Sequence, residues 1–243
     1  MATAATLGPS LTPTTIRYQA AVAMRPPQRL GRERAIRALN FVVALAAILI
    51  TAPIMAVVAL LVKATSRGPA IYKQPRVGID RRQSRGPGAL NHRRKSDTGG
   101  RVFTIYKFRT MRSTTSKARQ TWAAKNDPRI TPIGHVLRKT RLDELPQLFN
   151  VLKGDMNIVG PRPEQPSIFQ DLSQEVTHYR RRQRVLPGIT GLAQITLAYD
   201  QSVEDVKNKV NLDLEYIRRR SVGQDLMIMA KTMPVMVFRK GSM

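Results

Sequence analysis

The longest pattern along the chain is an uninterrupted apolar run of 22 residues, from Phe41 to Val62. A helix that rises about 1.5 Å per residue can cross a bilayer core with about 20 such residues. A buried helix of a soluble protein usually keeps a polar face, and a signal peptide has a shorter apolar region nearer the N-terminus. The run therefore predicts a membrane-embedded helix.

Two features of this run decide how it enters the membrane. Pro53 lies in its middle and predicts a break, because proline lacks the backbone N–H and clashes with the preceding turn; Thr51 could satisfy the freed carbonyls. Basic residues flank both ends, and positive charge favours the cytoplasmic side. The flanking residues are Arg25, Arg29, Arg32, Arg34 and Arg37 before the run, and Lys63, Arg67, Lys73, Arg76, Arg81 and Arg82 after it. We predict a re-entrant helix–break–helix over residues 32–62, with a kinked spanning helix as the alternative.

Shorter patterns predict short strands among amphipathic helices. Alternation and β-rich composition predict strands at residues 70–73 and 102–108, and a turn plus strand over residues 186–196. Helical spacing predicts helices over residues 133–140, 143–153, 165–183, 203–220 and 222–239, and a short polar helix over 113–125. We expect Asp143 to cap the second of these helices and Lys153-Gly154 to end it. The predicted fold class is mixed, helix-rich α/β: a re-entrant membrane hairpin carrying a domain of short strands and interfacial amphipathic helices.

Composition divides the chain further. Residues 1–31, rich in Ala, Thr, Pro and Arg, predict a disordered basic tail, and residues 63–243 form one domain. Within it, residues 80–99 are poor in apolar side chains and predict a basic loop. The chain has no cysteine, which excludes a disulfide scaffold, a cysteine-ligated zinc site and a cysteine nucleophile. Its three histidines lie far apart, without metal-ligand spacing.

The charge indicates an anionic partner. The net charge is +25 and the sequence pI is about 11.5. Residues 1–142 hold 27 of the 41 basic and 4 of the 16 acidic side chains. Such a basic half can bind nucleic acid, anionic membrane lipid or phosphate-bearing small molecules. The apolar run and the lack of a nucleic-acid motif favour lipid and small phosphates, so we expect no nucleic acid as a partner.

The adjacent carboxylates of Asp143 and Glu144 are the strongest candidates for chemistry. An acidic pair at a helix start is usually a solvated cap, but Arg138, Arg141 and Arg162 lie close in sequence. We expect the helix end and the arginines to lower the pKa of Asp143 and keep it ionised, as a nucleophile requires. The second carboxylate can hold a divalent cation, and arginines can bind phosphoryl oxygens.

Several motifs in this region carry a family resemblance. The chain resembles the bacterial sugar transferases, the monotopic polyprenol-phosphate phosphoglycosyl transferases, from about Arg34 to Arg239. The matching stretches are KFRTM (107–111), DPRITPIG (127–134), LRKTRLDELPQLFNVLKGDM (137–156), GPRPE (160–164), LPGITGLAQ (186–194) and the tail from DLEYI to DLMIMAKT (213–232).

The resemblance implies a reaction and a site. Members transfer a sugar-1-phosphate from a nucleoside diphosphate sugar, here expected to be a UDP-sugar, to membrane polyprenol (undecaprenyl) phosphate, and UMP leaves. Carried over, Asp143 is the nucleophile that forms a covalent phosphosugar intermediate, and Glu144 binds Mg²⁺. The expected phosphate- or nucleotide-binding residues are Lys107, Arg109, Arg138, Arg162 and Glu164. Pro53 matches the proline of the family's re-entrant helix break.

The resemblance also has departures and open points. Ala52 replaces the serine of the usual Ser-Pro break, and about fifteen extra residues interrupt the segment between residues 80 and 99. We expect a minimal catalytic form in the bacterial inner membrane, with its catalytic domain on the cytoplasmic face, initiating surface glycan or exopolysaccharide synthesis. A non-catalytic membrane scaffold is the alternative. The sequence decides neither the sugar, the pathway nor whether the chain forms a homo-oligomer.

Overall fold

The computed structural model describes residues 30–80, 99–112, 127–197 and 203–237. The predicted tail over residues 1–31, the basic loop over 80–99 and the polar helix over 113–125 lie largely or wholly outside these residues. The described elements are the helices α2 (Leu30–Thr65), α3 (Pro132–Thr140), α4 (Gln147–Lys153), α5 (Pro166–Glu175), α6 (Leu192–Thr196), α7 (Val203–Arg219) and α8 (Val222–Val237), the 3-10 helices η1 (Leu142–Glu144) and η2 (Tyr179–Arg184), and the strands β1 (Ile71–Val77), β2 (Val102–Phe108), β3 (Asn157–Val159) and β4 (Gly188–Thr190). This is the helix-rich mixed α/β class that the sequence predicts.

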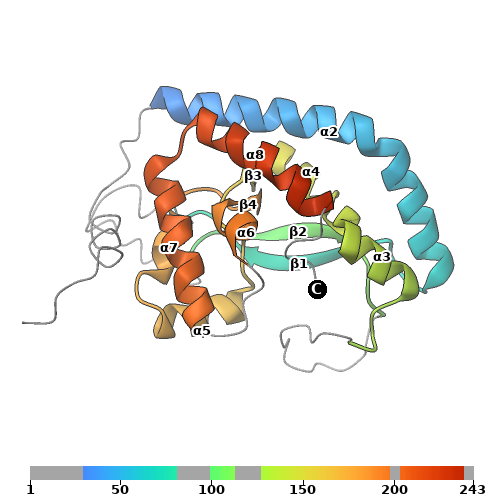
Figure 1. The fold of residues 1–243 in the computed structure, drawn as a ribbon. Coiled ribbons are helices and arrows are strands. Elements are labelled where there is room, and N and C mark those ends of the chain that lie inside the picture. The colour runs from blue at the N-terminus through green and yellow to red at the C-terminus, as the bar shows by residue number, and fades with distance from the viewer. Residues whose placement is uncertain (1–29, 81–98, 113–126, 198–202, 238–243) are drawn as a thin grey trace, which may run out of the picture.

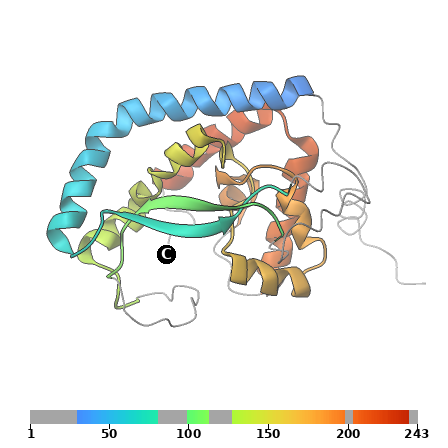
Figure 2. The same ribbon diagram turned by 180° about the vertical axis from the view of Figure 1, so that it is seen from behind.

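Helix α2 contains the whole apolar run. It runs along one side of the molecule and then bends, so that its second part descends past α3 (Figures 1 and 2). Pro53 lies inside it. The Thr51 hydroxyl donates to the Ala47 carbonyl at 2.6 Å, whereas the proline frees the carbonyl of Leu49, four residues before it. Thr51 therefore does not satisfy the freed group as we expected, but such back-bonding favours bending of a helix.

The outer side of α2 is not covered by protein. The helix is long and apolar enough to cross a membrane, and only 11% of its most apolar 18-residue window is buried. Leu49, Ile50 and Leu60 are among its exposed side chains. The structure therefore contradicts a soluble core helix, because such a helix would be mostly buried.

The N-terminal part of α2 is fixed to the domain by polar contacts. Arg37 donates to the last carbonyls of α4, at 2.6 Å to Val151 and 2.9 Å to Leu152. The buried Asn40 side chain accepts a hydrogen bond from the backbone N–H of Ile158, in the middle of β3. These contacts tie α2 to α4, which follows the acidic pair, and to β3, which precedes the GPRPE segment.

The strands form two small sheets. β1 and β2 pair antiparallel over their full length, with Ile71 opposite Phe108 and Val77 opposite Val102. β3 and β4 are parallel. Immediately after β3, Gly160 lies against Gly188, where an added Cβ would lie 2.1 Å from the Gly160 nitrogen. Only glycine permits this approach, which brings the GPRPE and LPGITG segments together.

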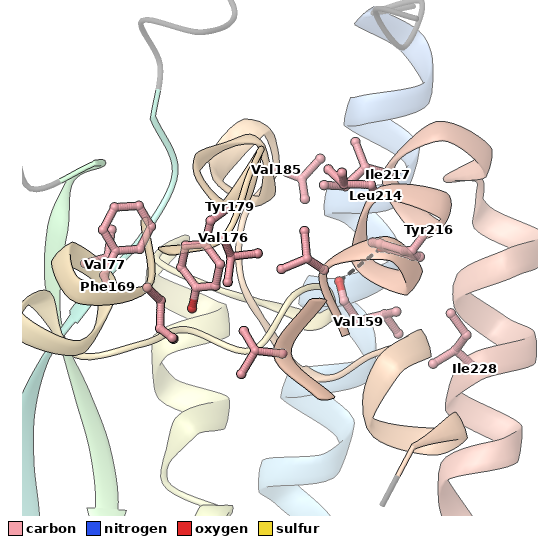
Figure 3. Close-up of a cluster of buried hydrophobic side chains, with 13 residues drawn as sticks. Val77, Val159, Phe169, Val176, Tyr179, Val185, Leu214, Tyr216, Ile217 and Ile228 are labelled. Carbon is pink, nitrogen blue, oxygen red and sulfur yellow. Dashed lines mark hydrogen bonds between the residues drawn. The ribbon is translucent and has the colours of Figure 1, made fainter. Parts of the chain in front are cut away.

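The main core lies where α5, η2, α7 and α8 surround β3 and β4. Figure 3 shows its side chains, including Val159, Phe169 and Ile228. Tyr216 belongs to the same cluster and donates from its hydroxyl to the Val159 carbonyl at 3.2 Å. Two smaller clusters join α2 to the rest, one through β2 and α4 and the other through α3. The inner side of α2 is therefore part of the hydrophobic core.

Several local predictions are wrong. Asp143 does not cap a helix over residues 143–153; it lies in η1, and α4 begins only at Gln147 after Pro146. Gly154 ends α4 in the left-handed conformation, as predicted. The helix predicted over 165–183 is interrupted by His178, which has a φ of 64°. Residues 192–196, predicted within a strand region, form α6.

Candidate active site

The predicted site residues converge on Glu144. Lys107 comes from β2, Glu144 from η1 and Arg162 from the segment after β3. The Lys107 ammonium lies 3.1 Å from Glu144 Oε1, and the Arg162 guanidinium lies 2.6 Å from the same oxygen. Arg141 Nη1 approaches it at 3.8 Å. Three elements far apart in sequence thus place three cations around one carboxylate.

Glu144 stays ionised in this arrangement. Burial by itself would raise its pKa, but the charges of Arg162 and Lys107 hold that pKa well below its usual range. Glu144 in turn raises the pKa of Arg162. Burial lowers the pKa of Lys107, against the opposing effect of Glu144. The carboxylate and its cations form a charged cluster that needs no proton in the neutral pH range.

Asp143 differs from its neighbour. Burial, and then the negative charge of Glu144, raise the pKa of Asp143, and the nearby Lys107 and Arg162 only partly oppose this. The sequence-based expectation of a lowered pKa is therefore wrong for Asp143 and holds for Glu144 instead. The expectation did not include the burial of Asp143 or the charge of Glu144, and the helix start that it assumed lies at Gln147 and not at Asp143.

The Asp143 carboxylate also has an unused oxygen. Its side chain is 7% exposed, and Oδ1 is buried without a hydrogen-bond partner. A buried acceptor that lacks a partner costs about 1–3 kcal/mol. A buried polar atom without a partner therefore marks a place where a ligand, a cation or a reacting group can bind.

Backbone geometry holds the acidic pair at this position. Arg141 has a φ of 59°, in the left-handed region that non-glycine residues rarely adopt, and it turns the chain from α3 directly into η1. Residues in this region carry about 1–3 kcal/mol of strain and cluster at functional sites. The turn places Asp143 and Glu144 against β2, next to Lys107.

Arg109 lies elsewhere. Its buried guanidinium caps the C-terminal end of α2, donating to the carbonyls of Ser66 and Pro69 at 2.6 Å each. Gly68, with a φ of 116°, allows this, since a Cβ there would lie 2.5 Å from Arg109 Nη1. Arg109 therefore stabilises the junction between α2 and β1, and we do not carry it into the substrate-binding set.

Glu164 and Arg138 have contacts of their own, away from the three cations that surround Glu144. Glu164 pairs with Lys209 at 3.2 Å and with Arg76 at 3.8 Å. Burial would raise its pKa, but these cations and Arg182 hold the pKa of Glu164 at about 2. Arg138, on α3, contacts the Met111 sulfur at 3.5 Å. Glu164 is thus a structural ion-pair partner, and Arg138 approaches from a separate element.

Sequence reasoning missed the charged residues behind the site. Arg182 and Asp213 form a buried ion pair at 2.7 Å. Arg182 stands in the basic run 180–184, where nothing in the sequence separates a buried arginine from its solvated neighbours. Asp213 could have been suspected, because it shares a helix face with the apolar Val206, Val210 and Ile217.

Comparison with known proteins agrees with the geometry. The model of the family described as "Bacterial sugar transferase" matches residues 32–239. The chain belongs to the bacterial sugar transferase family. The converging residues Lys107, Glu144 and Arg162 all lie inside the matched range.

Curated relatives of this bacterial sugar transferase carry names that differ in the sugar. The UDP-N-acetylgalactosamine-undecaprenyl-phosphate N-acetylgalactosaminephosphotransferase of Aeromonas hydrophila is 38% identical over 81% of this chain and 42% of its own length. The UDP-glucose:undecaprenyl-phosphate glucose-1-phosphate transferase of Escherichia coli is 38% identical over 81% of this chain and 39% of its own. A Caulobacter vibrioides protein with the same name is 34% identical over 94% of this chain and 77% of its own. The chain thus spans about two fifths of the first two relatives.

The acidic pair offers the small number of carboxylates that Mg²⁺ commonly uses. Within the described residues, no group of three or more histidine, cysteine or acidic side chains could enclose a metal. Mg²⁺ commonly uses only one or two carboxylates together with substrate phosphates. Glu144 and the partnerless Oδ1 of Asp143 match that smaller set.

Proposed function

We propose that this chain transfers a sugar-1-phosphate from a UDP-sugar to undecaprenyl phosphate, through a covalent intermediate on Asp143. A carboxylate oxygen of Asp143 attacks the β-phosphorus, the bond from that phosphorus to the bridging oxygen breaks, and UMP leaves. An oxygen of undecaprenyl phosphate then attacks the same phosphorus and releases the Asp143 carboxylate. This would be an initiating step of surface polysaccharide synthesis.

The observation that carries the proposal is the pairing of a buried, partnerless oxygen on Asp143 with a cluster of cations one residue away. Phosphoryl transfer depends mainly on positioning and on cations that stabilise charge on the phosphoryl oxygens. Arg162 offers a guanidinium fork that suits phosphate, and Lys107 offers a point charge. Names of relatives that share 34–38% identity supply the substrate classes.

Glu144 has two roles in this proposal. It holds Lys107 and Arg162 in place before the substrate arrives, and together with Asp143 it would hold Mg²⁺. Mg²⁺, when bound, would neutralise the negative charge of the diphosphate. Arg138 would reach the nucleotide or the phosphates from α3. Lys107 and Arg162 favour the ionised, nucleophilic form of Asp143, against the burial and the negative charge of Glu144 that raise its pKa.

The membrane arrangement is also part of the proposal. The bend of α2 and its basic flanks support a re-entrant helix that enters and leaves through the cytoplasmic leaflet of the inner membrane (Figure 1). Its exposed side chains would lie in lipid, and anionic head groups would meet the basic flanks. A lipid-borne acceptor would then reach Asp143 without leaving the bilayer surface.

UMP release tests the proposal. Detergent-purified protein is mixed with undecaprenyl phosphate, Mg²⁺ and a panel of UDP-sugars, beside Asp143→Asn and the matched control Asp171→Asn, an exposed carboxylate on α5. We expect UMP release with at least one sugar, lost in Asp143→Asn and kept in Asp171→Asn. Release that persists in Asp143→Asn would refute the assigned nucleophile.

A further inference from the structure

The segment that carries Arg162 is held by its carbonyl groups. Each carbonyl of residues 161–164 accepts a hydrogen bond from another part of the chain. The donors are the Gly188 N–H to Pro161 (3.0 Å), Arg182 Nη2 to Arg162 (3.0 Å), Arg76 Nη1 to Pro163 (3.0 Å) and the Val77 N–H to Glu164 (2.9 Å). The segment is thus fastened to β1 on one side and to η2 and β4 on the other.

The segment is held through its carbonyls because two of its residues cannot donate hydrogen bonds. Pro161 and Pro163 lack backbone N–H groups, so neither can donate a hydrogen bond. Extended backbone without a partner strand depends on side chains for its remaining contacts. For the carbonyl of Arg162 that side chain is Arg182.

Arg182 is itself fixed from several directions. It is 1% exposed, and its Nε donates to Asp213 Oδ2 at 2.7 Å. Nη1 donates to the Tyr179 hydroxyl at 2.8 Å, and the guanidinium carbon lies 4.9 Å from the centre of the Tyr179 ring. Tyr179 belongs to the main core (Figure 3). These contacts fix the orientation of the planar guanidinium. Its third nitrogen, Nη2, donates to the Arg162 carbonyl.

We propose that Arg182, oriented by Asp213, is a positioning residue for Arg162. Its hydrogen bond to the Arg162 carbonyl sets the backbone from which the Arg162 guanidinium reaches Glu144 at 2.6 Å. Arg182 acts through Arg162, since its own hydrogen bonds go to Asp213, Tyr179 and that carbonyl. This inference rests on the proposed function, because Arg162 is taken to stabilise the transferring phosphoryl group.

The test needs a variant that removes the contact without leaving a buried charge. Arg182→Met alone would leave Asp213 buried and unpaired, which is strongly destabilising. The double replacement Arg182→Met with Asp213→Leu, here called the apolar pair, removes both charges and is often tolerated. Arg182→Lys is the conservative variant, because a lysine keeps the charge beside Asp213 but not the planar fork.

A mutant cycle distinguishes the loss of Arg162 positioning from a general loss of structure. Arg162→Met should lower kcat/KM for UMP release about 100-fold, a typical loss for a charge-stabilising donor. The apolar pair should lower it about 10-fold to 100-fold, mainly through kcat, and Arg182→Lys about 10-fold with a near-normal melting temperature. Adding Arg162→Met to the apolar pair should cause no further loss beyond that of Arg162→Met alone, because coupled residues are not additive.

The matched control is Arg220→Met. Arg220 is also a buried arginine, but it pairs with Glu33 on α2 at 2.8 Å. Its effect should multiply with that of Arg162→Met. If the effects of the apolar pair and Arg162→Met also multiply, or if the folded apolar pair keeps wild-type kcat/KM, the positioning claim is overturned.

Hydrogen exchange tests the claim independently of catalysis. The Val77 and Gly188 amides donate to the same segment as Arg182. In the apolar pair they should exchange about 10-fold faster than in the wild type, and in Arg220→Met they should not. Unchanged exchange in the apolar pair would overturn the claim. Failure of wild-type protein to release UMP from any UDP-sugar would instead refute the proposed function and leave this exchange measurement valid.

Discussion

Two charged clusters lie next to each other in this molecule and differ in how completely they are satisfied. The Glu144 cluster is partly open: Arg162 and Arg141 keep 31% and 35% of their side chains exposed, and Asp143 Oδ1 has no partner. The Arg182–Asp213 pair behind it is closed, with side chains 1% and 2% exposed and the guanidinium bonded on all sides. The residues 161–164 join the two clusters.

The difference separates two uses of buried charge. A closed cluster stabilises one arrangement of the chain, because each charge has a fixed partner and breaking one partner is costly. An open cluster keeps an unsatisfied acceptor and accessible cations, which a phosphate-bearing ligand can complete. Substitutions in the open cluster should therefore affect turnover directly. Substitutions in closed contacts should affect stability, and they should affect turnover where the contact holds a residue of the open cluster, as Arg182 holds Arg162.

The largest effect is expected from Glu144→Gln. Loss of its charge frees Lys107 and Arg162 from their shared carboxylate and removes the proposed Mg²⁺ ligand. We expect kcat/KM for UMP release to fall about 10²-fold to 10³-fold, in the range found for electrostatic transition-state stabilisers. Initial-rate kinetics at saturating Mg²⁺ would measure it. A kcat/KM within about threefold of the wild-type value would contradict a catalytic role for Glu144.

The next largest effect is expected from Arg109→Met, because it removes the hydrogen bonds of a buried guanidinium. The carbonyl of Val62 in the last turn of α2, and those of Ser66 and Pro69 just beyond it, would lose their charged donor. We expect the free energy of unfolding to fall by about 3 kcal/mol, the scale of a hydrogen bond to a charged group plus unsatisfied acceptors. Thermal unfolding in detergent would measure this. A normal melting temperature with a lost kcat would return Arg109 to the phosphate-binding residues.

An effect of similar size at neutral pH, which becomes smaller in acid, is expected from Glu164→Gln. The pKa of Glu164 in the folded protein is about 2, below its ordinary value of 4.5. A lowered pKa contributes stability above the unfolded value, and this contribution is lost as the pH falls from about 4.5 towards 2. We expect wild type to exceed Glu164→Gln by about 3 kcal/mol at neutral pH, with the difference shrinking below pH 4.5. A difference that does not change with pH would contradict the ion pairing.

Much of the fold was predictable because its patterns are local. The strand over residues 102–108 and the helix through the apolar run follow from periodicity and length, and Gly154 marks the end of α4. The parallel pairing of β3 with β4 was not predictable, since three-residue strands show no period. The break at His178 was missed because its left-handed backbone has no glycine to signal it.

The site was predictable only in part. Motif resemblance named Lys107, Glu144 and Arg162, and the structure brings them together; spacing alone could not, because they belong to three separate elements. The position of Arg109 was not predictable, since alternation on the strand does not reveal that its guanidinium turns to the end of α2. The opposite pKa directions of Asp143 and Glu144 depend on how deeply each carboxylate is buried and on how closely Arg162 and Lys107 approach Glu144, which the sequence does not specify.

The most direct test of the central claim uses one substrate and no acceptor. Wild-type protein, Asp143→Asn and Asp171→Asn are each mixed with Mg²⁺ and the UDP-sugar that supports turnover, without undecaprenyl phosphate. We predict a burst of UMP equal to the amount of active protein, together with a sugar-phosphate adduct on wild type and Asp171→Asn that intact-mass spectrometry detects and peptide mapping assigns to Asp143. Turnover that requires both substrates at once, with no adduct and no burst, would contradict the covalent mechanism.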